Sequence, residues 1–507
     1  MWHAKEREAR QMASNRCTSA IGRSWRLRIV ASLSVCMVNC ASAGEQVLGY
    51  HLDISNCKVP RLETMFHIVD ILAKLGYNHL QMNTEHTFAY PQHEPVWRTA
   101  SPMTPDEVRS LDAYCAQRGI EFVPNQNSFG HLGKWLRLPE YNHLAESPQG
   151  GCHASYRAEP MKFPMSLCPT DPRSIEFVAG LYDSLLPCFR SKQVNVGLDE
   201  TYELFDVTGC GRSASEIRAR GAERVYLDYF KKIYALVKAR GCKMMFWGDI
   251  ILHKPELISE IPEDVTCLNW GYGRNHPFDK EAAQFAAAKR RFLICPGTRT
   301  WGTISGCVPE MCQNVDRAVE AGVKHGAAGY LMADWDDGGG VSPWIVSLPP
   351  VVYLSLRVRG MVPSHEQFVA EIDRVAGCRC GEALLAYGEI YRASRGRNDN
   401  ATEMCYALRD GRNYKRAVAK GVTDDTLAAA KAQHEKAKAL FVSAGAPQWI
   451  QDDFALLDLV CRASEVRAMK PDTVNFRAMF EPEYRRLWLT NSRPGGLEES
   501  LNINFGL

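Results

Sequence analysis

One apolar run of this chain ends in two adjacent carboxylates: Val194-Asn195-Val196-Gly197-Leu198-Asp199-Glu200. Its valines and leucine are typical of a buried strand. Two carboxylates at the end of such a strand cost free energy unless they are hydrogen-bonded or used for chemistry. Acids at the start of a following helix would also be favourable, because they face the positive end of the helix dipole. Asp199 and Glu200 are therefore either a catalytic pair or acids that decorate a helix start.

Seven further apolar runs flank this strand, separated by amphipathic stretches with helical spacing. The eight runs are Val47–Ile54, His79–Met82, Ile120–Pro124, Val194–Leu198, Lys243–Trp247, Val265–Trp270, Phe292–Cys295 and Gly326–Met332. The helical patterns between them include Arg61–Lys74, Pro105–Arg118, Ala222–Arg240 and Val315–His325. Eight strand–helix units in about 300 residues predict an α/β fold, a (β/α)8 TIM barrel.

Polar and aromatic side chains follow each predicted strand, which in a barrel places them on the C-terminal face where active sites are built. The candidates for substrate binding at these positions are Asp53, Glu85, His86, Asn127, His131, Trp247, Asp249, Trp270, Tyr272, Trp301, Trp335 and Asp336. The tryptophans could equally be core aromatics, the histidines structural, and the aspartates helix caps. The loop from Gly130 to Asp171 is long, and long loops in compact barrels tend to be functional.

The pattern becomes helical beyond about residue 355. The segments 381–395, 423–444 and 449–469 carry apolar residues at helical spacing. No catalytic constellation is evident there. We therefore expect a catalytic barrel at 44–350 and an α-helical C-terminal domain at 351–507.

The first 43 residues resemble a secretory signal peptide rather than part of the fold. Arg23, Arg26 and Arg28 precede an apolar run, Ile29–Val38, and Ala41-Ser42-Ala43 offers the small residues that a signal peptidase reads. We expect a mature chain starting near Gly44, exported to the periplasm or medium, with no membrane-spanning segment after cleavage. Asn39 before Cys40 fits a lipidation site poorly, so a lipid anchor at Cys40 is not expected. The alternative is an unstructured basic tail on a cytoplasmic protein.

The composition is that of an ordinary globular protein, with 46% hydrophobic and 23% charged residues and a formal net charge of +2. It favours neither nucleic-acid binding nor electrostatic docking to a membrane. Of the 18 cysteines, 15 follow the expected cleavage site. Most stand singly in apolar runs, and Cys378-Arg379-Cys380 is too close for a zinc knuckle. We expect no structural metal and no cofactor, and the spacing assigns no disulfide.

Adjacent carboxylates suit a particular kind of glycoside hydrolysis. This reaction needs a proton donor for the leaving oxygen and a second group that stabilises the oxocarbenium-like centre, ordinarily a carboxylate about 5 Å or more away. Adjacent residues seldom face each other in that way. They do suit a substrate-assisted mechanism, in which the 2-acetamido oxygen of the sugar attacks the anomeric carbon. Glu200 would then be the general acid/base, and Asp199 would hold the acetamido N–H.

Several segments resemble the family 20 glycoside hydrolases, the β-N-acetylhexosaminidases. Residues 195–200, Asn-Val-Gly-Leu-Asp-Glu, are similar to the family's His/Asn-x-Gly-x-Asp-Glu signature. Residues 124–131 resemble its Pro-Glu-Ile-Asp-Met-Pro-Gly-His segment, and residues 48–53 its Arg-Gly-x-x-Leu-Asp first strand. The Thr-Glu-His-Thr-Phe segment at 84–88, the Asn-Gln-Asn-Ser-Phe-Gly-His segment at 125–131 and the Arg-Pro-Gly-Gly-Leu segment at 493–497 look closest to a divergent bacterial subgroup. The resemblance implies an exo-acting retaining enzyme that releases terminal GlcNAc or GalNAc.

The resemblance also implies roles for single residues, with two departures. Trp335 would floor the sugar site, and Tyr272 would bind the acetamido carbonyl. Leu48 stands where the family has an arginine that grips the 3- and 4-hydroxyls, and a leucine cannot make such bonds. Asn127 replaces an aspartate that links the histidine matching His131 into a polar network, so that the pH profile would differ.

Three other functions remain open at this point. A metal-dependent hydrolase could gather His51, Asp53, His86, His131 and Asp249 around an ion, although no His-x-His pair ends a strand. A glycan-binding protein could retain the barrel without catalysis, and the two departures favour it. A retaining glycosidase acting on sugars without an acetamido group would need a nucleophile across the pocket, with Asp249 or Asp336 as candidates.

Overall fold

The computed structural model describes residues 46–155, 157, 159–394, 402–409, 422–469 and 475–506. The expected signal segment, its cleavage site and Cys40 lie outside these residues. None of the described helices is both long enough and apolar enough to cross a membrane.

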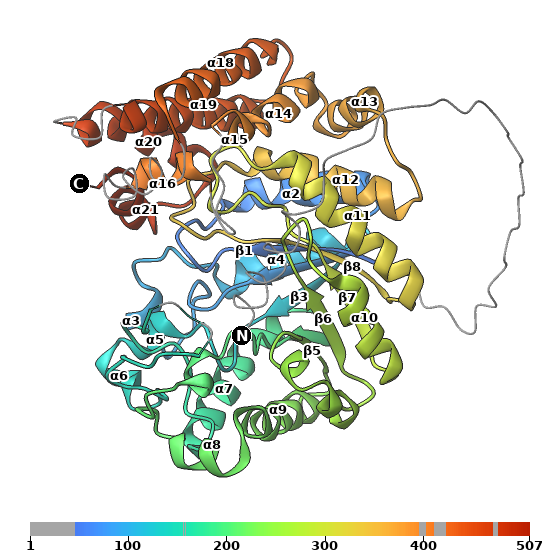
Figure 1. Ribbon diagram of the computed structural model, residues 1–507, viewed down its shortest axis with the longest axis vertical. Helices are drawn as coiled ribbons and strands as arrows, with labels where there is room; N and C mark the ends of the chain where they lie inside the picture. Colours follow the sequence, from blue (N-terminus) through green and yellow to red (C-terminus); the bar gives the residue numbers. More distant parts are fainter. Residues whose placement is uncertain are drawn as a thin grey trace, which may run out of the picture.

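Eight parallel strands close into a barrel in chain order, with β1 hydrogen-bonded to both β2 and β8 (Figure 1). The strands are β1 (Val47–Asp53), β2 (His79–Asn83), β3 (Glu121–Asn125), β4 (Gln193–Asn195), β5 (Lys243–Trp247), β6 (Thr266–Trp270), β7 (Arg291–Cys295) and β8 (Gly329–Asp334). The predicted (β/α)8 barrel is confirmed. Polar residues at the strand ends therefore share one face of the barrel.

Helices cover the outside of the barrel, and shorter helices lie within its loops. They are α2 (Leu62–Lys74), α3 (Glu94–Trp97), α4 (Pro105–Ala116), α5 (Gly133–Leu136), α6 (Pro139–Asn142), α7 (Pro172–Leu185), α8 (Ala214–Arg220), α9 (Ala222–Ala239), α10 (Phe278–Ala287), α11 (Val308–His325) and α12 (Leu348–Val358). Short 3-10 helices add η1 (Leu186–Cys188), η2 (Tyr202–Phe205), η3 (Ile251–His253), η4 (Pro255–Glu260) and η5 (Trp344–Ser347). Local signals set several ends: Thr104 and Glu107 form a capping box before α4, and Gly326 ends α11 in the left-handed region.

Side chains alternate between two cores. The inner core fills the barrel and consists of Val123, Met245, Trp247, Leu268, Leu293, Cys295 and Leu331. The outer core lies between strands and helices, and it includes Leu48, Tyr50 and Leu52 of β1. Because successive strand residues face opposite sides, His51 and Asp53 point into the barrel.

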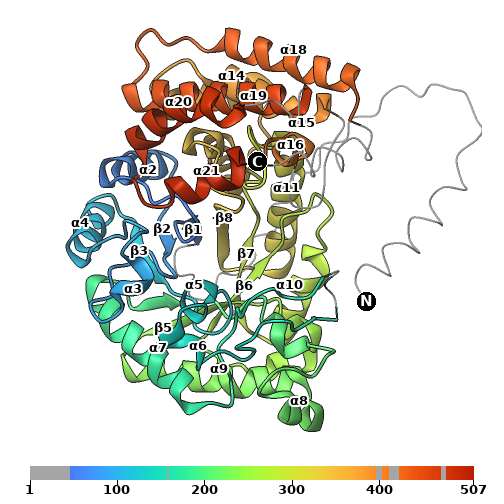
Figure 2. The ribbon, with the colours of Figure 1, turned by 90° about the vertical axis from the view of Figure 1, so that its left-hand side faces the viewer.

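The C-terminal helical region is also present. It contains α13 (His365–Ala376), α14 (Gly381–Tyr387), α15 (Ile390–Ala393), α16 (Glu403–Arg409), α18 (Asp424–Leu440), α19 (Gln448–Met469), α20 (Phe476–Asn491) and α21 (Leu497–Phe505). Figures 1 and 2 show α18, α19 and α20 gathered at one end of the molecule, beyond the barrel. The expected boundary at residue 350 falls inside α12. This helix packs on the barrel, where Tyr77 donates to the Val351 carbonyl and Ser355 to the Leu75 carbonyl.

The last described helix, α21, reaches back to loops on the C-terminal face of the barrel. Lys134 of the loop after β3 pairs with Glu499 at 2.6 Å, and Ser500 donates to the Gly339 carbonyl in the loop after β8. Just before α21, Arg493 bonds Glu107 and the carbonyls of Pro60 and Pro102. The segment 493–505 therefore joins four barrel loops, those after β1, β2, β3 and β8.

Candidate active site

A left-handed turn carries the two carboxylates out of β4. Gly197, Leu198 and Glu200 have φ of 70°, 72° and 48°. A Cβ at Gly197 would lie 2.0 Å from the Asn127 amide oxygen, so both the conformation and the space require glycine. The Asn195 side chain accepts the Gly197 N–H at 3.0 Å. The strand therefore ends at Asn195, three residues earlier than its apolar pattern predicts.

His131 lies between the two carboxylates. Its Nε2 atom is 3.3 Å from Asp199 Oδ2 and 3.5 Å from Glu200 Oε2. Burial lowers the pKa of His131, but the charges and hydrogen bonds of the two carboxylates outweigh it and raise the pKa well above its ordinary value. A Cβ at Gly130 would lie 2.7 Å from the Asp199 carbonyl, so the loop after β3 presses directly on the turn.

Glu200 is half-buried, whereas Asp199 is almost fully buried with Oδ1 unpartnered. Burial raises the pKa of Glu200. The hydrogen bond and charge of His131, with smaller contributions from Tyr202 and Arg157, outweigh burial and leave that pKa below its usual range. A partly open carboxylate beside a buried one with a free oxygen can serve as proton donor and as acceptor for a bound N–H, respectively.

Asp249, in the segment after β5, supports this pair. Its carboxylate accepts the backbone N–H of Glu200 at 3.1 Å and the indole N–H of Trp270 at 3.2 Å. Burial, followed by the charge of Asp199, raises the pKa of Asp249 well above its ordinary value. The side chain therefore positions Glu200 and is not a free carboxylate.

Aromatic side chains gather at and after the ends of β6, β7 and β8. The Trp335 indole donates to the Tyr272 hydroxyl at 2.8 Å. Trp270 stacks on Tyr272 at 5.1 Å between centroids, and Trp301 meets its edge at 4.9 Å. Trp247 is buried below them, 5.8 Å from Trp335. Burial raises the pKa of Tyr272 well above its ordinary value, so its hydroxyl keeps its proton. The cluster offers an apolar wall with one phenolic donor.

Together, these observations place two adjacent carboxylates, a bridging histidine and an aromatic wall at the C-terminal face of a barrel. Residues 49–300 match the catalytic-domain model of glycosyl hydrolase family 20. The chain is a member of this family.

Curated relatives of this family 20 chain are distant. It is 23% identical over 228 residues to hexosaminidase D of Homo sapiens, with 44% of each chain covered. It is 24% identical over 268 residues to a beta-hexosaminidase of Akkermansia muciniphila, with half of each chain covered. The matches therefore span about half the length of these two relatives. A chitobiase of Flavobacterium johnsoniae has the same fold, with a TM-score of 0.53 and 15% identity over 90% of this chain and 77% of that one.

Two acids predicted to contact substrate brace loops in this family 20 barrel. The Asp53 carboxylate accepts from Ser55, Asn56, Asn83 and the Asp336 N–H. Asp336 accepts the Lys58 N–H at 2.9 Å, and burial raises its pKa to about 8. These bonds fix the loops after β1, β2 and β8 relative to one another.

The residues after β2 and β3 divide between the site and its flank. Asn127 donates to Glu85 at 3.4 Å, and burial raises the pKa of Glu85 to about 8, with the charges of His131 and Asp199 also acting on it. His86 is buried, which lowers its pKa to about 3, and its electrostatic neighbours are Lys134 and Arg137. Glu85 therefore belongs to the surroundings of the carboxylates, while the charges that act on His86 are those of Lys134 on α5 and of Arg137 just after it.

His51 is a site residue for which the sequence suggested only a metal role. It points into the barrel, 4.5 Å from Trp335 and 5.2 Å from Trp247. Its Nε2 atom bonds the Asn125 amide at 3.1 Å, and Asn125 in turn bonds Asn195. Burial lowers the pKa of His51 to about 4, so it is neutral. The sequence signal for this placement was that His51 lies two residues before Asp53 on β1, so both side chains point to the same side of the strand.

Leu48 has a different place from that implied by the resemblance. It packs in the outer core, on the side of β1 that faces the helices. In this family 20 chain the position therefore lies behind the barrel wall, and its leucine leaves the mouth unchanged.

Metal ligands do not gather at this site. Within the described part of the chain, Cys152, Asp206 and Cys210 are the acidic, histidine or cysteine residues whose ligand atoms lie close enough to hold an ion. The five residues of the metal-hydrolase alternative do not form such a group.

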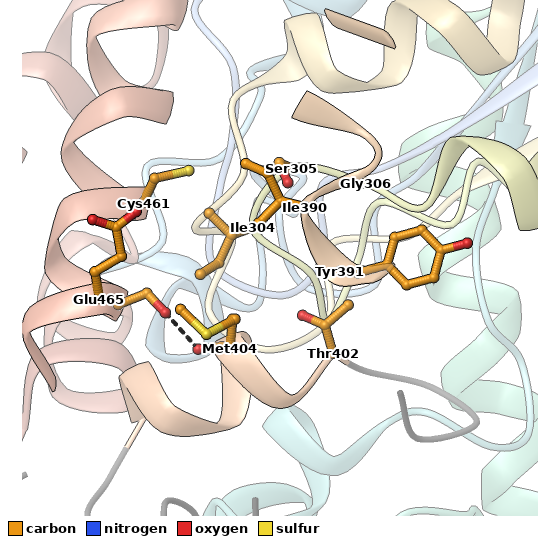
Figure 3. A pocket seen from close by; sticks show the side chains of 10 residues that line it. Ile304, Ser305, Gly306, Ile390, Tyr391, Thr402, Met404, Cys461 and Glu465 are labelled. Atoms are coloured by element: carbon orange, nitrogen blue, oxygen red, sulfur yellow. Dashed lines mark hydrogen bonds between the residues drawn. The ribbon is translucent and has the colours of Figure 1, made fainter. Parts of the chain in front are cut away.

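A small pocket lies elsewhere, between the barrel loop 304–306 and helices α15, α16 and α19 (Figure 3). Its cavity volume is about 20 Å³, room for about one water molecule. Ser464 donates to the Met404 carbonyl at one wall. Neither Asp199 nor Glu200 lines this pocket, so it is separate from the family 20 site.

Proposed function

We propose that this family 20 member is an exo-acting β-N-acetylhexosaminidase that removes terminal GlcNAc or GalNAc with retention, by a substrate-assisted mechanism. One observation carries the proposal: the Asp199 and Glu200 carboxylates are adjacent and share His131, while each oxygen of Asp249, a candidate for an opposing nucleophile, already accepts an N–H group. The nucleophile then comes from the sugar itself.

Each side chain has a definite task in this proposal. The half-buried Glu200 protonates the departing glycosidic oxygen as the acetamido oxygen attacks the anomeric carbon. The free Oδ1 of Asp199 accepts the acetamido N–H and stabilises the positive charge of the oxazolinium ion. Glu200 then removes a proton from the water that opens this ion, with overall retention.

The aromatic wall completes the sugar site. The Tyr272 hydroxyl accepts from Trp335, so its own proton is available to the acetamido oxygen. Trp335 and Trp301 present flat apolar surfaces on which a sugar ring or the acetamido methyl packs. This arrangement favours sugars with a 2-acetamido group.

A pair of nitrophenyl sugars tests the proposal. We expect hydrolysis of the β-GlcNAc or β-GalNAc compound, with the β-anomer of the free sugar appearing first by NMR. The matched β-glucoside should react at least about 10²-fold more slowly, because it carries no internal nucleophile. Equal rates would overturn the mechanism, and no hydrolysis of any of them would favour a glycan-binding role.

We further propose that the chain is exported, on the strength of the basic, apolar and small-residue order of residues 23–43. N-terminal sequencing of the protein from its native host should begin near Gly44. An intact basic N-terminus in the cytoplasmic fraction would contradict this proposal.

A further inference from the structure

Two cysteines meet beside the proposed active site. Cys152 belongs to the loop after β3, and Cys210 to the segment that follows the catalytic pair. Their Sγ atoms lie 2.7 Å apart, closer than two unbonded sulfur atoms normally approach. Cys152 is buried and Cys210 is exposed.

The backbone brings these side chains together. Ala154 and Asp206 form an antiparallel bridge. On either side of it, Val207 donates to the His153 carbonyl at 2.9 Å and Ser155 to the Phe205 carbonyl at 3.0 Å. The Asp206 carboxylate also accepts the N–H groups of His153 at 2.7 Å and of Cys210 at 3.0 Å, which holds the two cysteine-bearing segments against each other. The sulfur contact is therefore a property of the two loops.

We propose that Cys152 and Cys210 form a disulfide that clamps the loop after β3 to the segment after Glu200. Formation is a thiol–disulfide exchange. The exposed Cys210 loses its proton and attacks an oxidised small-molecule or protein disulfide, releasing one thiolate of that partner. The deprotonated Cys152 then displaces the second partner sulfur, so that the two cysteines are oxidised and the partner disulfide is reduced to two thiols.

A metal ion is the alternative occupant of this pair. The ligand atoms of Cys152, Asp206 and Cys210 all lie within 4.8 Å of one another. However, Asp206 already accepts the N–H groups of His153, Thr208 and Cys210 and the Thr208 hydroxyl. Its carboxylate shapes the loop, which leaves two sulfurs and favours the disulfide over a closed metal site.

The clamp reaches the proposed acid through two residues, Arg157 and Tyr202. Tyr202 donates its N–H to the Glu200 carbonyl at 2.7 Å, and the Arg157 guanidinium covers the Tyr202 ring at 4.5 Å. Both Tyr202 and the charge of Arg157 contribute to lowering the pKa of Glu200. Arg157 donates its N–H to the carbonyl of Ala154, the bridge residue, at 3.0 Å, so the disulfide would hold this cation near Glu200. This functional part rests on the proposed activity.

Alkylation mapping tests the bond itself and is independent of catalysis. The full chain is equilibrated in a glutathione redox buffer, denatured without reductant, alkylated and digested. We expect Cys152 and Cys210 to be unlabelled and to appear in one linked peptide, while Cys210 becomes reactive in Cys152→Ser. Alkylation of both in the wild type, or a stoichiometric zinc ion retained by the untreated protein, would overturn the proposal.

The pH profile tests the positioning role. The two samples without the disulfide are the double variant Cys152→Ser/Cys210→Ser and the wild type reduced with a phosphine. In both, the pH at which kcat/KM falls on the alkaline side should rise by about half a pH unit, because Arg157 is no longer held near Glu200 and lowers its pKa less. Cys312→Ser, on α11, is the matched control and should leave the profile unchanged. A linked peptide with an unshifted profile would remove the positioning role. Absent hydrolysis in every variant would count against the proposed function alone.

Discussion

The carboxylate of Asp249 accepts the backbone N–H of Glu200 at 3.1 Å, so the proposed acid is aimed by a neighbouring strand as well as by its own. Glu200 has φ of 48°, a conformation that a non-glycine residue adopts only when its surroundings hold it there. The same carboxylate bonds Trp270, which links the acid to the aromatic wall.

Asp249→Asn should retain activity within about tenfold, whereas Asp249→Ala should lose about 10²-fold in kcat. Burial and the charge of Asp199 raise the pKa of Asp249, so its negative charge contributes little, and an amide oxygen still accepts the Glu200 N–H. Steady-state kinetics on a nitrophenyl N-acetylhexosaminide measures the difference. Complete inactivation by the Asn substitution, together with covalent labelling of Asp249 by a fluorosugar, would make Asp249 a nucleophile.

Glu200→Gln should lower turnover by about 10²-fold or more on a chitobiose-like disaccharide, because the amide has no proton to transfer. The loss should be smaller on a dinitrophenyl glycoside, whose leaving group needs no acid. The ratio of the two rates is the measurement. Equal losses on both substrates would remove Glu200 from the role of acid.

Asp199→Asn should lose turnover more than ground-state binding, since the charge matters most when the oxazolinium ion forms. A thiazoline analogue of GlcNAc mimics that ion and should inhibit the wild type competitively. Its affinity for Asp199→Asn, measured by calorimetry, should fall by about tenfold or more. Unchanged affinity would show that Asp199 does not face the acetamido group.

The charge on His131 should set the pH range of activity. The lowered pKa of Glu200 places the alkaline fall of kcat/KM on the acidic side of neutrality. His131→Asn removes the charge but keeps an N–H donor, so the Glu200 pKa should rise and the fall should move to higher pH. An unchanged or acid-shifted profile would contradict this coupling.

The contacts of His131 with Asp199 and Glu200 also predict that the stability of the protein depends on pH. Because the folded pKa of His131 is raised, its contribution is fully present below the unfolded value of about 6.5 and is lost as pH rises through the folded pKa. The stability difference between wild type and His131→Asn should therefore shrink at alkaline pH. Urea unfolding at pH 6 and at pH 10 measures it.

Gly496→Ala should destabilise the protein by about 2 kcal/mol or more and reduce activity. Gly496 has φ of 78°, and a Cβ there would lie 1.8 Å from the Cys57 carbonyl. Gly445→Ala is the control, with φ of 80° and no atom within 4 Å of the added Cβ. Both variants carry backbone strain, but only the first should displace the loop after β1. Equal melting temperatures for the two variants would refute this reasoning.

The barrel was predictable because its parallel strands are buried and hence nearly continuous apolar runs. The end of β4 was not, since Leu198 is apolar and packs in the outer core while its backbone is left-handed. Strand-end positions also identified the aromatic wall and His131. They could not separate side chains that face the sugar from those, such as Asp53, that accept loop N–H groups, because the two look alike in sequence.

Two features of the site depend on residues far apart in the chain. His51 lies within an ordinary strand pattern, and only closure of the barrel brings it against Trp247 and Trp335. Leu48 was interpreted through a resemblance of short segments, which carries no information on the direction of a side chain. The closed structure supplies that direction.

The return of α21 to the catalytic face has a consequence for modular engineering. A barrel excised at residue 350 would lose the partners of Lys134 and Gly339 together with the Arg493 contacts to two loops and to α4. Grafting the barrel into another protein would therefore require the last helix to travel with it. A protease that removed α21 would take these contacts away from the loops while leaving Asp199 and Glu200 intact.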